Sequence, residues 1–126
     1  MKLNQLERRL ETLEGFFDPS PHLEQYPTRP ALAARLLFEA ALRGDIRGKR
    51  VCDLGCGTGI LAIGAAILGA GEVIAVDIDR KALEIARKNA TSNDVSILFL
   101  EADCRDESTH FRVGACDTVV MNPPFG

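Results

Sequence analysis

The segment Met121-Asn122-Pro123-Pro124-Phe125-Gly126 places hydrogen-bond acceptors next to an aromatic ring. The side-chain oxygen of Asn122 and the carbonyl of Pro123 could each accept one hydrogen from an amino group conjugated to a ring. This would localise the nitrogen lone pair for attack on an electrophilic methyl group. Pro123 and Pro124 would hold the acceptors in place in advance. Phe125 offers a face on which a flipped base could stack, a contact worth about 1–3 kcal/mol. Taken alone, the motif could also be a plain proline turn after a strand.

A second candidate site is the glycine-rich segment Asp53-Leu54-Gly55-Cys56-Gly57-Thr58-Gly59. It follows an expected strand and opens an expected helix, which is where open parallel sheets bind nucleotide-like ligands. Ile60 stands where a dinucleotide fingerprint needs its third glycine or alanine, and no Walker lysine follows. A carboxylate at Asp53 would repel a pyrophosphate but suits the ammonium group of a methionine-like ligand. The loop therefore favours a methionine-containing nucleoside over a dinucleotide.

Further acids follow the next two expected strands. Asp77 is spaced from the glycine loop as a ribose-binding acid would be, and its carboxylate could accept both ribose hydroxyl hydrogens. Asp79 competes for that role, but it stands where the next helix needs an N-cap. Asp103 could accept from an adenine amino group while the backbone N–H of Cys104 meets a ring nitrogen. The plain alternative for Asp103 is a turn carboxylate.

The elements that would position these residues alternate between strands and helices from residue 50 onward. This alternation predicts an α/β, Rossmann-like, doubly wound and mostly parallel sheet with right-handed crossovers. We assign residues 1–48 to an N-terminal helical extension and residues 49–126 to the core of the same domain. The expected strands are Arg50–Leu54, Val73–Val76, Val95–Leu100 and Cys116–Met121, and the expected core helices are Ile60–Leu68 and Arg80–Ala90.

The N-terminal extension shows two helical patterns. A leucine stripe over residues 2–14 predicts a helix packed on the domain, with partner docking as the lesser alternative. Thr28 is a plausible N-cap for a second helix that ends at about Leu42, with Pro30 in its first turn.

Charge excludes a strongly basic nucleic-acid binder. Lys and Arg number 15 and Asp and Glu 18, which gives a net charge of −3. Any nucleic-acid contact must then be local, shared with a partner, or carried by further sequence. A small basic run, Arg43, Arg47, Lys49 and Arg50, precedes the first expected strand and so lies at the end of the sheet away from the glycine loop. We interpret it as a solvated turn.

The cysteines have no metal-ligand spacing, so no metal site is predicted. Cys52 and Cys116 lie in apolar runs and are expected to be reduced, buried thiols. The chain has no apolar stretch of about 18 residues and no signal-peptide core, which predicts a cytoplasmic protein without a membrane span.

The chain resembles class I methyltransferases that methylate amino groups, and within them the archaeal and eukaryotic methyltransferase-like RNA adenine-N6 methylases of small-subunit ribosomal RNA. The resemblance covers nearly the whole chain. It includes Leu23-Glu24-Gln25-Tyr26-Pro27-Thr28-Arg29-Pro30, within which Glu24-Gln25-Tyr26-Pro27-Thr28 is the most specific segment. The remaining matches are Asp53-Leu54-Gly55-Cys56-Gly57, Leu68-Gly69-Ala70-Gly71, Asp77-Ile78-Asp79 and Asn122-Pro123-Pro124-Phe125-Gly126.

The resemblance implies transfer of a methyl group from S-adenosylmethionine to the exocyclic N6 of adenine in RNA. It implies catalysis by Asn122, Pro123, Pro124 and Phe125. It also implies that Gln25 and Thr28, in a cofactor-closing loop of the extension, lie over the cofactor beside Gly55, Thr58, Ile60, Asp77, Asp103 and Cys104. In such enzymes a small zinc-binding activator protein is a partner that would cover an exposed sheet edge.

Members of that family continue past the proline motif, so we expect a sheet that is incomplete after its fourth strand. Two alternatives to the RNA enzyme stay open. One is a glutamine-N5 methyltransferase of release factors, although those enzymes usually carry Tyr where this chain has Phe125, and they lack the Gln25–Thr28 segment. The other is a cofactor-binding fragment without turnover.

Overall fold

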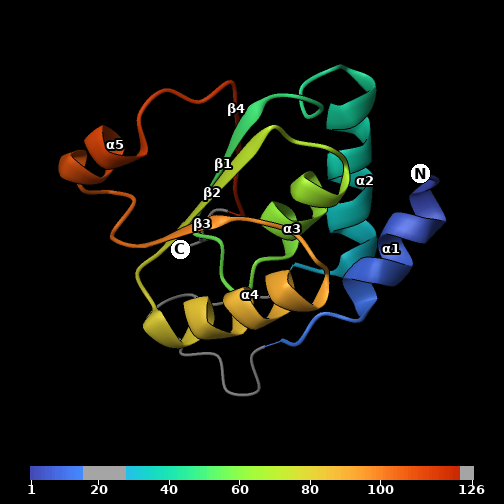
Figure 1. Ribbon diagram of the computed structural model, residues 1–126, viewed down its shortest axis with the longest axis horizontal. Coiled ribbons are helices and arrows are strands. Elements are labelled where there is room, and N and C mark those ends of the chain that lie inside the picture. The colour runs from blue at the N-terminus through green and yellow to red at the C-terminus, as the bar shows by residue number, and fades with distance from the viewer. Residues whose placement is uncertain (16–27, 123–126) are drawn as a thin grey trace.

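Four parallel strands form the central sheet: β1 (Arg50–Leu54), β2 (Glu72–Asp77), β3 (Leu98–Glu101) and β4 (Thr118–Val120). The structure, a computed structural model, describes residues 1–15 and 28–122. The strand order is β3-β2-β1-β4 (Figure 1). In register, Leu54 lies opposite Val76 and Asp53 opposite Val120. The predicted α/β fold with a Rossmann-like parallel sheet is confirmed.

The described residues also form five helices: α1 (Leu3–Glu11), α2 (Pro30–Leu42), α3 (Ile60–Ile67), α4 (Arg80–Ser92) and α5 (Glu107–Val113). Side chains alternate across the strands, so Val51 and Val73 pack with α1, α2 and α3, whereas Cys52 and Ile74 pack with Val113 of α5. Figure 1 shows α5 on the side of the sheet away from α2 and α3. In the described parts of the chain, no helix has the length and apolar character that a bilayer crossing requires.

One helix was missed and one local prediction is wrong. No helix was expected between the third and fourth strands, yet α5 is present, with the Asp106 side chain accepting from the Ser108 N–H at 3.0 Å. Thr28 does not cap α2, because Arg29 occupies the N-cap position without a side-chain bond. The Thr28 hydroxyl instead accepts from the Asn122 side-chain amide at 2.9 Å. A long-range hydrogen bond thus replaces the local one.

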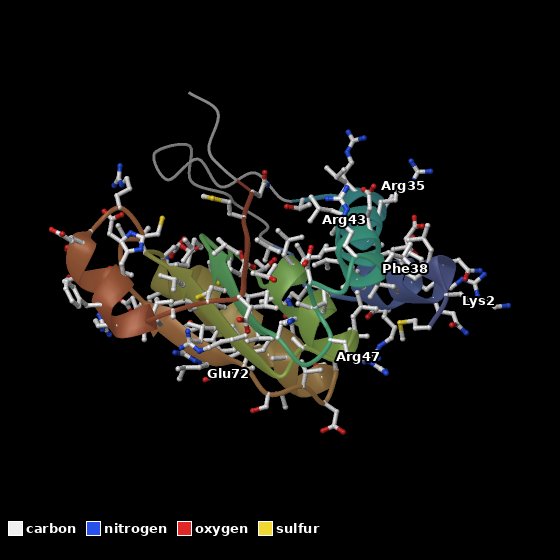
Figure 2. All side chains as sticks on the ribbon, turned by 90° about the horizontal axis from the view of Figure 1, so that it is seen from above. Lys2, Arg35, Phe38, Arg43, Arg47 and Glu72 are labelled. Carbon is white, nitrogen blue, oxygen red and sulfur yellow. A yellow bond between two sulfur atoms is a disulfide. The ribbon has the colours of Figure 1, made fainter. Side chains whose placement is uncertain are left out.

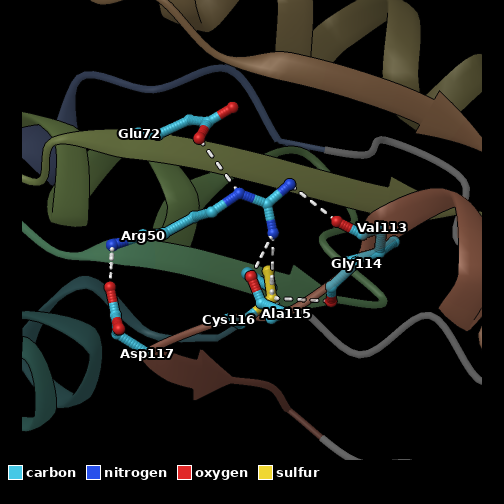
Figure 3. Close-up of polar contacts among 8 residues, drawn as sticks. Arg50, Glu72, Val113, Gly114, Ala115, Cys116 and Asp117 are labelled. Carbon is cyan, nitrogen blue, oxygen red and sulfur yellow. Dashed lines mark hydrogen bonds and ion pairs between the residues drawn. A yellow bond between two sulfur atoms is a disulfide. The ribbon is translucent and has the colours of Figure 1, made fainter.

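Arg50 is a structural residue and not part of a solvated turn. Its guanidinium binds Glu72 at 3.0 Å and the carbonyls of Val113 and Ala115 at 2.6 Å each (Figure 3). Arg50 thereby fixes the connection from α5 to β4 at the end of the sheet where β1 and β2 begin. Arg47 and Glu72 lie along this end in Figure 2. The interpretation of this basic run as a solvated turn is therefore wrong for Arg50.

The expectation of reduced thiols is also wrong for one pair of cysteines. Cys52 and Cys116 form a disulfide, with Cα atoms 6.2 Å apart and a sequence separation of 64 residues. Cys56 and Cys104 are free. This pairing could not be predicted from the sequence, because it depends on β1 and β4 being neighbours in the sheet.

We predict that the unreduced, unfolded protein has two titratable thiols out of its four cysteines. Reduction should lower the free energy of unfolding by about 4 kcal/mol, because the disulfide closes a long loop in the unfolded chain. Ellman titration in denaturant and urea unfolding with and without dithiothreitol measure the two effects. Four reactive thiols without reductant would contradict the pairing.

Candidate active site

The glycine loop is held against the end of β2 by backbone hydrogen bonds. The N–H groups of Gly55 and Cys56 both donate to the Val76 carbonyl, at 2.7 and 2.8 Å. Gly59 has φ +94° and precedes α3, and a Cβ there would lie 3.2 Å from Ala86 Cβ. Gly57 has φ +56° with open space where a Cβ would point. The loop is therefore packed against α4 at Gly59 and open to an approaching ligand at Gly57.

Asp77 organises this loop through its side chain. One carboxylate oxygen accepts the Gly57 N–H at 2.7 Å, and the other accepts the Asp79 N–H at 2.9 Å. A carboxylate has about four acceptor positions, so these bonds are compatible with further donors such as ribose hydroxyls. Asp79 caps α4 by accepting from the Lys81 N–H at 2.9 Å, which confirms that prediction. The two acids thus have the separate structural positions that the sequence indicated.

Asp53 is a buried acid, with 1% of its surface exposed. One oxygen accepts the Ala62 N–H at 3.1 Å, and Oδ1 has no hydrogen-bond partner among the described residues. Burial raises the pKa of Asp53 to about 7, and the neighbouring Asp77 carboxylate adds to the rise, against the lowering effect of the Ala62 N–H. A buried acceptor without a partner fits a cationic donor, so the ammonium group of S-adenosylmethionine suits this position.

Asp103 and Cys104 lie at the same edge, because the Ala102 N–H donates to the Asp77 carbonyl at 3.0 Å. The Asp103 carboxylate binds the Arg105 guanidinium through both oxygens, at 3.0 Å each, and this contact lowers the pKa of Asp103. An adenine amino group would therefore share this acceptor with Arg105 or displace it. Cys104 is a half-exposed free thiol.

The hydrogen bond between Thr28 and Asn122 joins two candidate residues 94 positions apart in sequence. Because Val120 lies opposite Asp53, residue 122 reaches the edge of the sheet that carries the glycine loop. Gln25, Pro123, Pro124 and Phe125 lie outside the described residues. Thr58 and Ile60 are both half-buried, Thr58 in the loop and Ile60 as the first residue of α3.

Two residues at the site were missed by the sequence reasoning. Ile78 follows Asp77 and is 48% exposed, an apolar side chain available to a flat ring at the ligand edge. Asn89 is buried in α4 and donates to the Thr58 carbonyl at 2.9 Å. The signal for Ile78 was an apolar residue between two acids. The signal for Asn89 was a polar residue on the inner face of a helix.

Cys56 is poorly suited to act as a nucleophile, since its side chain is buried. Burial raises the pKa of its thiol, and the Asp53 and Asp77 carboxylates add to that rise. The thiolate needed for covalent catalysis is thus disfavoured. This leaves a site made of acceptors and backbone groups, which suits binding and orientation more than acid–base or covalent chemistry.

Comparison with known proteins relates this site to methyltransferases. The family model described as ribosomal protein L11 methyltransferase (PrmA) matches residues 34–122. The rRNA N(6)-adenosine-methyltransferase METTL5 of Danio rerio is 44% identical over the whole chain. A putative protein N5-glutamine methyltransferase of Methanocaldococcus jannaschii is 37% identical over 82% of the chain, which covers 49% of that protein. The chain spans 61% of the length of the Danio rerio protein.

Solved structures give the same relation. A putative RNA methyltransferase from Pyrococcus horikoshii superposes with a TM-score of 0.87 at 39% identity, over 98% of this chain and 60% of that one. A Pyrococcus abyssi tRNA (uracil-54, C5)-methyltransferase in complex with S-adenosyl-L-homocysteine has a TM-score of 0.62 at 29% identity, over 79% of this chain and 24% of that one.

We predict opposite effects of Asp53→Asn on stability and on cofactor affinity. Because its pKa is raised, the folded state binds the Asp53 proton more tightly than the unfolded chain does. The contribution of Asp53 to the free energy of unfolding is therefore fully present below about pH 4. It is lost as the pH rises through about 7. Asp53→Asn should therefore unfold with a higher free energy at pH 8, by at most about 4 kcal/mol, and with little difference at pH 4. Its affinity for S-adenosylmethionine at pH 8 should fall by about tenfold or more, since the ammonium group loses its charged partner.

Urea unfolding at pH 4 to 8 and calorimetric titration with S-adenosylmethionine measure the two quantities. Asp45→Asn, at an exposed acid outside the site, is the control. Parallel pH profiles for Asp53→Asn and wild type would contradict the assignment of the titrating group.

Proposed function

We propose that this chain is the cofactor-binding part of an enzyme that methylates the exocyclic N6 of adenine in RNA. The chain belongs to the family of class I S-adenosylmethionine-dependent methyltransferases that the ribosomal protein L11 methyltransferase (PrmA) model describes. The observation that carries the proposal is the hydrogen bond from Asn122 to Thr28. It joins the amino-accepting motif to the segment most specific to RNA adenine methylases. Small-subunit ribosomal RNA is the substrate we favour.

S-adenosylmethionine, when bound, supplies the electrophilic methyl group. Asp53 would hold its ammonium group, because Asp53 Oδ1 is a buried acceptor without a described partner. Asp77 would accept from the ribose hydroxyls while it keeps Gly57 in place. Asp103 and the Cys104 N–H would meet the adenine edge, with Ile78 beside the ring. Gln25 is proposed to complete this site.

Asn122 would orient the substrate nitrogen. Its amide nitrogen donates to Thr28, which fixes the amide plane, and the amide oxygen has two acceptor positions. One substrate amino hydrogen would bind this oxygen and the other the Pro123 carbonyl, so that the lone pair points at the methyl group. Pro124 would stiffen the turn and Phe125 would stack on the base. After transfer, solvent can take the surplus proton, so no general base is needed.

Glutamine-N5 methylation of a protein is the second candidate function. The chemistry is equivalent, since a carboxamide nitrogen is also conjugated, and a relative carrying that name is 37% identical. That relative matches a smaller share of the chain than the Danio rerio RNA enzyme does. A third reading is that the chain, which spans 61% of the length of the Danio rerio protein, binds the cofactor without turnover.

The open edge of β3 is the place we propose for the zinc-binding activator protein. An open groove of about 450 Å³ runs between α4 and β3 and includes Val95, Ile97 and Leu98. Leu98 is 55% exposed, and the Arg87 guanidinium lies 5.7 Å from the centre of the Phe99 ring. An exposed strand edge with apolar side chains favours pairing with a partner strand. We propose the cytoplasm as the compartment.

We predict that the chain transfers labelled methyl groups from S-adenosylmethionine to RNA, and that nucleoside digestion yields N6-methyladenosine. Asn122→Ala should lower the rate by about 100-fold or more, because an oriented acceptor is lost, with cofactor affinity nearly unchanged. Label in protein would favour the glutamine enzyme. Cofactor binding without transfer to either substrate would favour the non-catalytic reading.

We predict that Arg29 contacts an RNA phosphate. Arg29 follows Thr28 directly, is exposed, and makes no ion pair with another described residue. Arg29→Ala should weaken RNA binding and reduce the slope of log affinity against log salt by about 1, without changing cofactor affinity. The control is Lys49→Ala, at the opposite end of the sheet. Equal losses in both variants would contradict a local contact.

A further inference from the structure

Asn89 is a polar side chain buried in the packed face of α4, with 4% of its surface exposed. Its amide nitrogen donates to the carbonyls of Glu14 and Thr58, at 2.9 Å each, and its amide oxygen accepts the Glu14 N–H at 2.8 Å. Both ends of the side chain are therefore satisfied. Burying an amide requires such partners, and here all of them come from outside α4.

The partners of the Asn89 side chain belong to two segments that lie far apart in the sequence. Glu14 is 75 residues away and follows α1, and Thr58 is 31 residues away in the glycine loop. One amide group thus connects the N-terminal extension to the loop that faces the cofactor. We call this arrangement the Asn89 bridge.

A second contact fixes α1 to α4 without touching the glycine loop. The Arg9 guanidinium donates to the Asn93 carbonyl at 3.2 Å and to its side-chain oxygen at 3.3 Å. Leu6 and Leu10 of α1 are fully buried in the same core. Docking of α1 therefore has an apolar part, an Arg9 part that is separate from the site, and the Asn89 bridge, which alone reaches the loop.

The Asn89 bridge holds the glycine loop at Thr58, in the middle of the part that faces a ligand. Thr58 lies between Gly57, whose N–H binds Asp77, and Gly59, which packs on Ala86 of α4. A shift of the Thr58 carbonyl would turn the peptide that follows it and move the backbone offered to a ligand. Undocking the extension from Asn89 should then alter the loop as well.

We propose that Asn89 is a positioning residue that couples docking of the N-terminal extension to cofactor affinity. Docking holds the glycine loop in its binding conformation, and a bound cofactor strengthens docking by the same factor, since coupling between two sites is reciprocal. The proposal rests on the proposed function in one respect, which is that the ligand of the loop is S-adenosylmethionine.

The test compares Asn89→Ala with Asn93→Ala, at the residue that follows α4. The Asn93 side chain accepts from Arg9 and donates to the Asn89 backbone carbonyl, and it makes no hydrogen bond to the glycine loop. Calorimetry should show S-adenosylmethionine binding weakened about tenfold by Asn89→Ala and less than twofold by Asn93→Ala, each measured where the variant is fully folded. Equal weakening in the two variants would overturn the coupling.

Hydrogen exchange gives a readout that a purely structural role would not move. In wild type, the cofactor should slow exchange at residues 10–15, and most at the Glu14 N–H, which donates to Asn89. In Asn89→Ala that ligand-dependent slowing should be lost, and in Asn93→Ala it should persist. If Asn89→Ala does not fold, wild type alone still decides, because unchanged exchange at residues 10–15 with saturating cofactor would overturn the proposal.

Failure of the coupling and failure of the proposed function give different results. Absence of S-adenosylmethionine binding to folded wild type would remove the cofactor assignment itself. Normal binding to wild type, with Asn89→Ala behaving like Asn93→Ala, would remove only the coupling.

Discussion

The attachment of the glycine loop to the end of β2 is the constraint on which the site depends. Two N–H groups share the Val76 carbonyl, and a third binds the Asp77 carboxylate. These bonds are made because β1 and β2 pair in parallel with Leu54 opposite Val76. The same register brings the Asp53 and Asp77 carboxylates close enough for their charges to interact, which contributes to the raised pKa of Asp53. The pairing of β1 with β2 thus creates the site that would bind the ligand, and it also contributes to the raised pKa of Asp53, which lowers stability at high pH while the site is empty.

Features set by local sequence could be predicted, and features set by contacts between distant segments could not. The strand–helix alternation, the glycine loop and the Asp79 cap depend on neighbouring residues and were found. The partner of Thr28 depends on β4 lying next to β1, so the local N-cap was chosen in place of Asn122. Arg50 was misread for the same reason, since its partners Val113 and Ala115 are more than 60 residues away. Helix α5 has only seven residues, too few for a clear hydrophobic period.

The two faces of the sheet differ in how fully they are covered. Four helices pack against the face that carries Val51 and Val73, whereas α5 is the helix on the other face within the described residues. Val119 belongs to that second face, opposite Cys52 in register, and is 52% exposed. This face thus leaves an apolar strand residue exposed, although α5 covers another part of it. The glycine loop does not depend on this face, because its hydrogen bonds are made with Val76, Asp77 and Asn89.

The position of β4 in the sheet also sets an order of events during synthesis. β1 pairs with β2, whose residues follow it by 22 positions, but its other neighbour β4 follows by 67. A ribosome adds roughly 5–20 residues per second, so β1, α3 and β2 can associate seconds before β4 is available. The glycine loop and Asp77 are then already made while Asn122 is not. A newborn chain would thus acquire the residues that hold a ligand before the residue that orients a substrate amine.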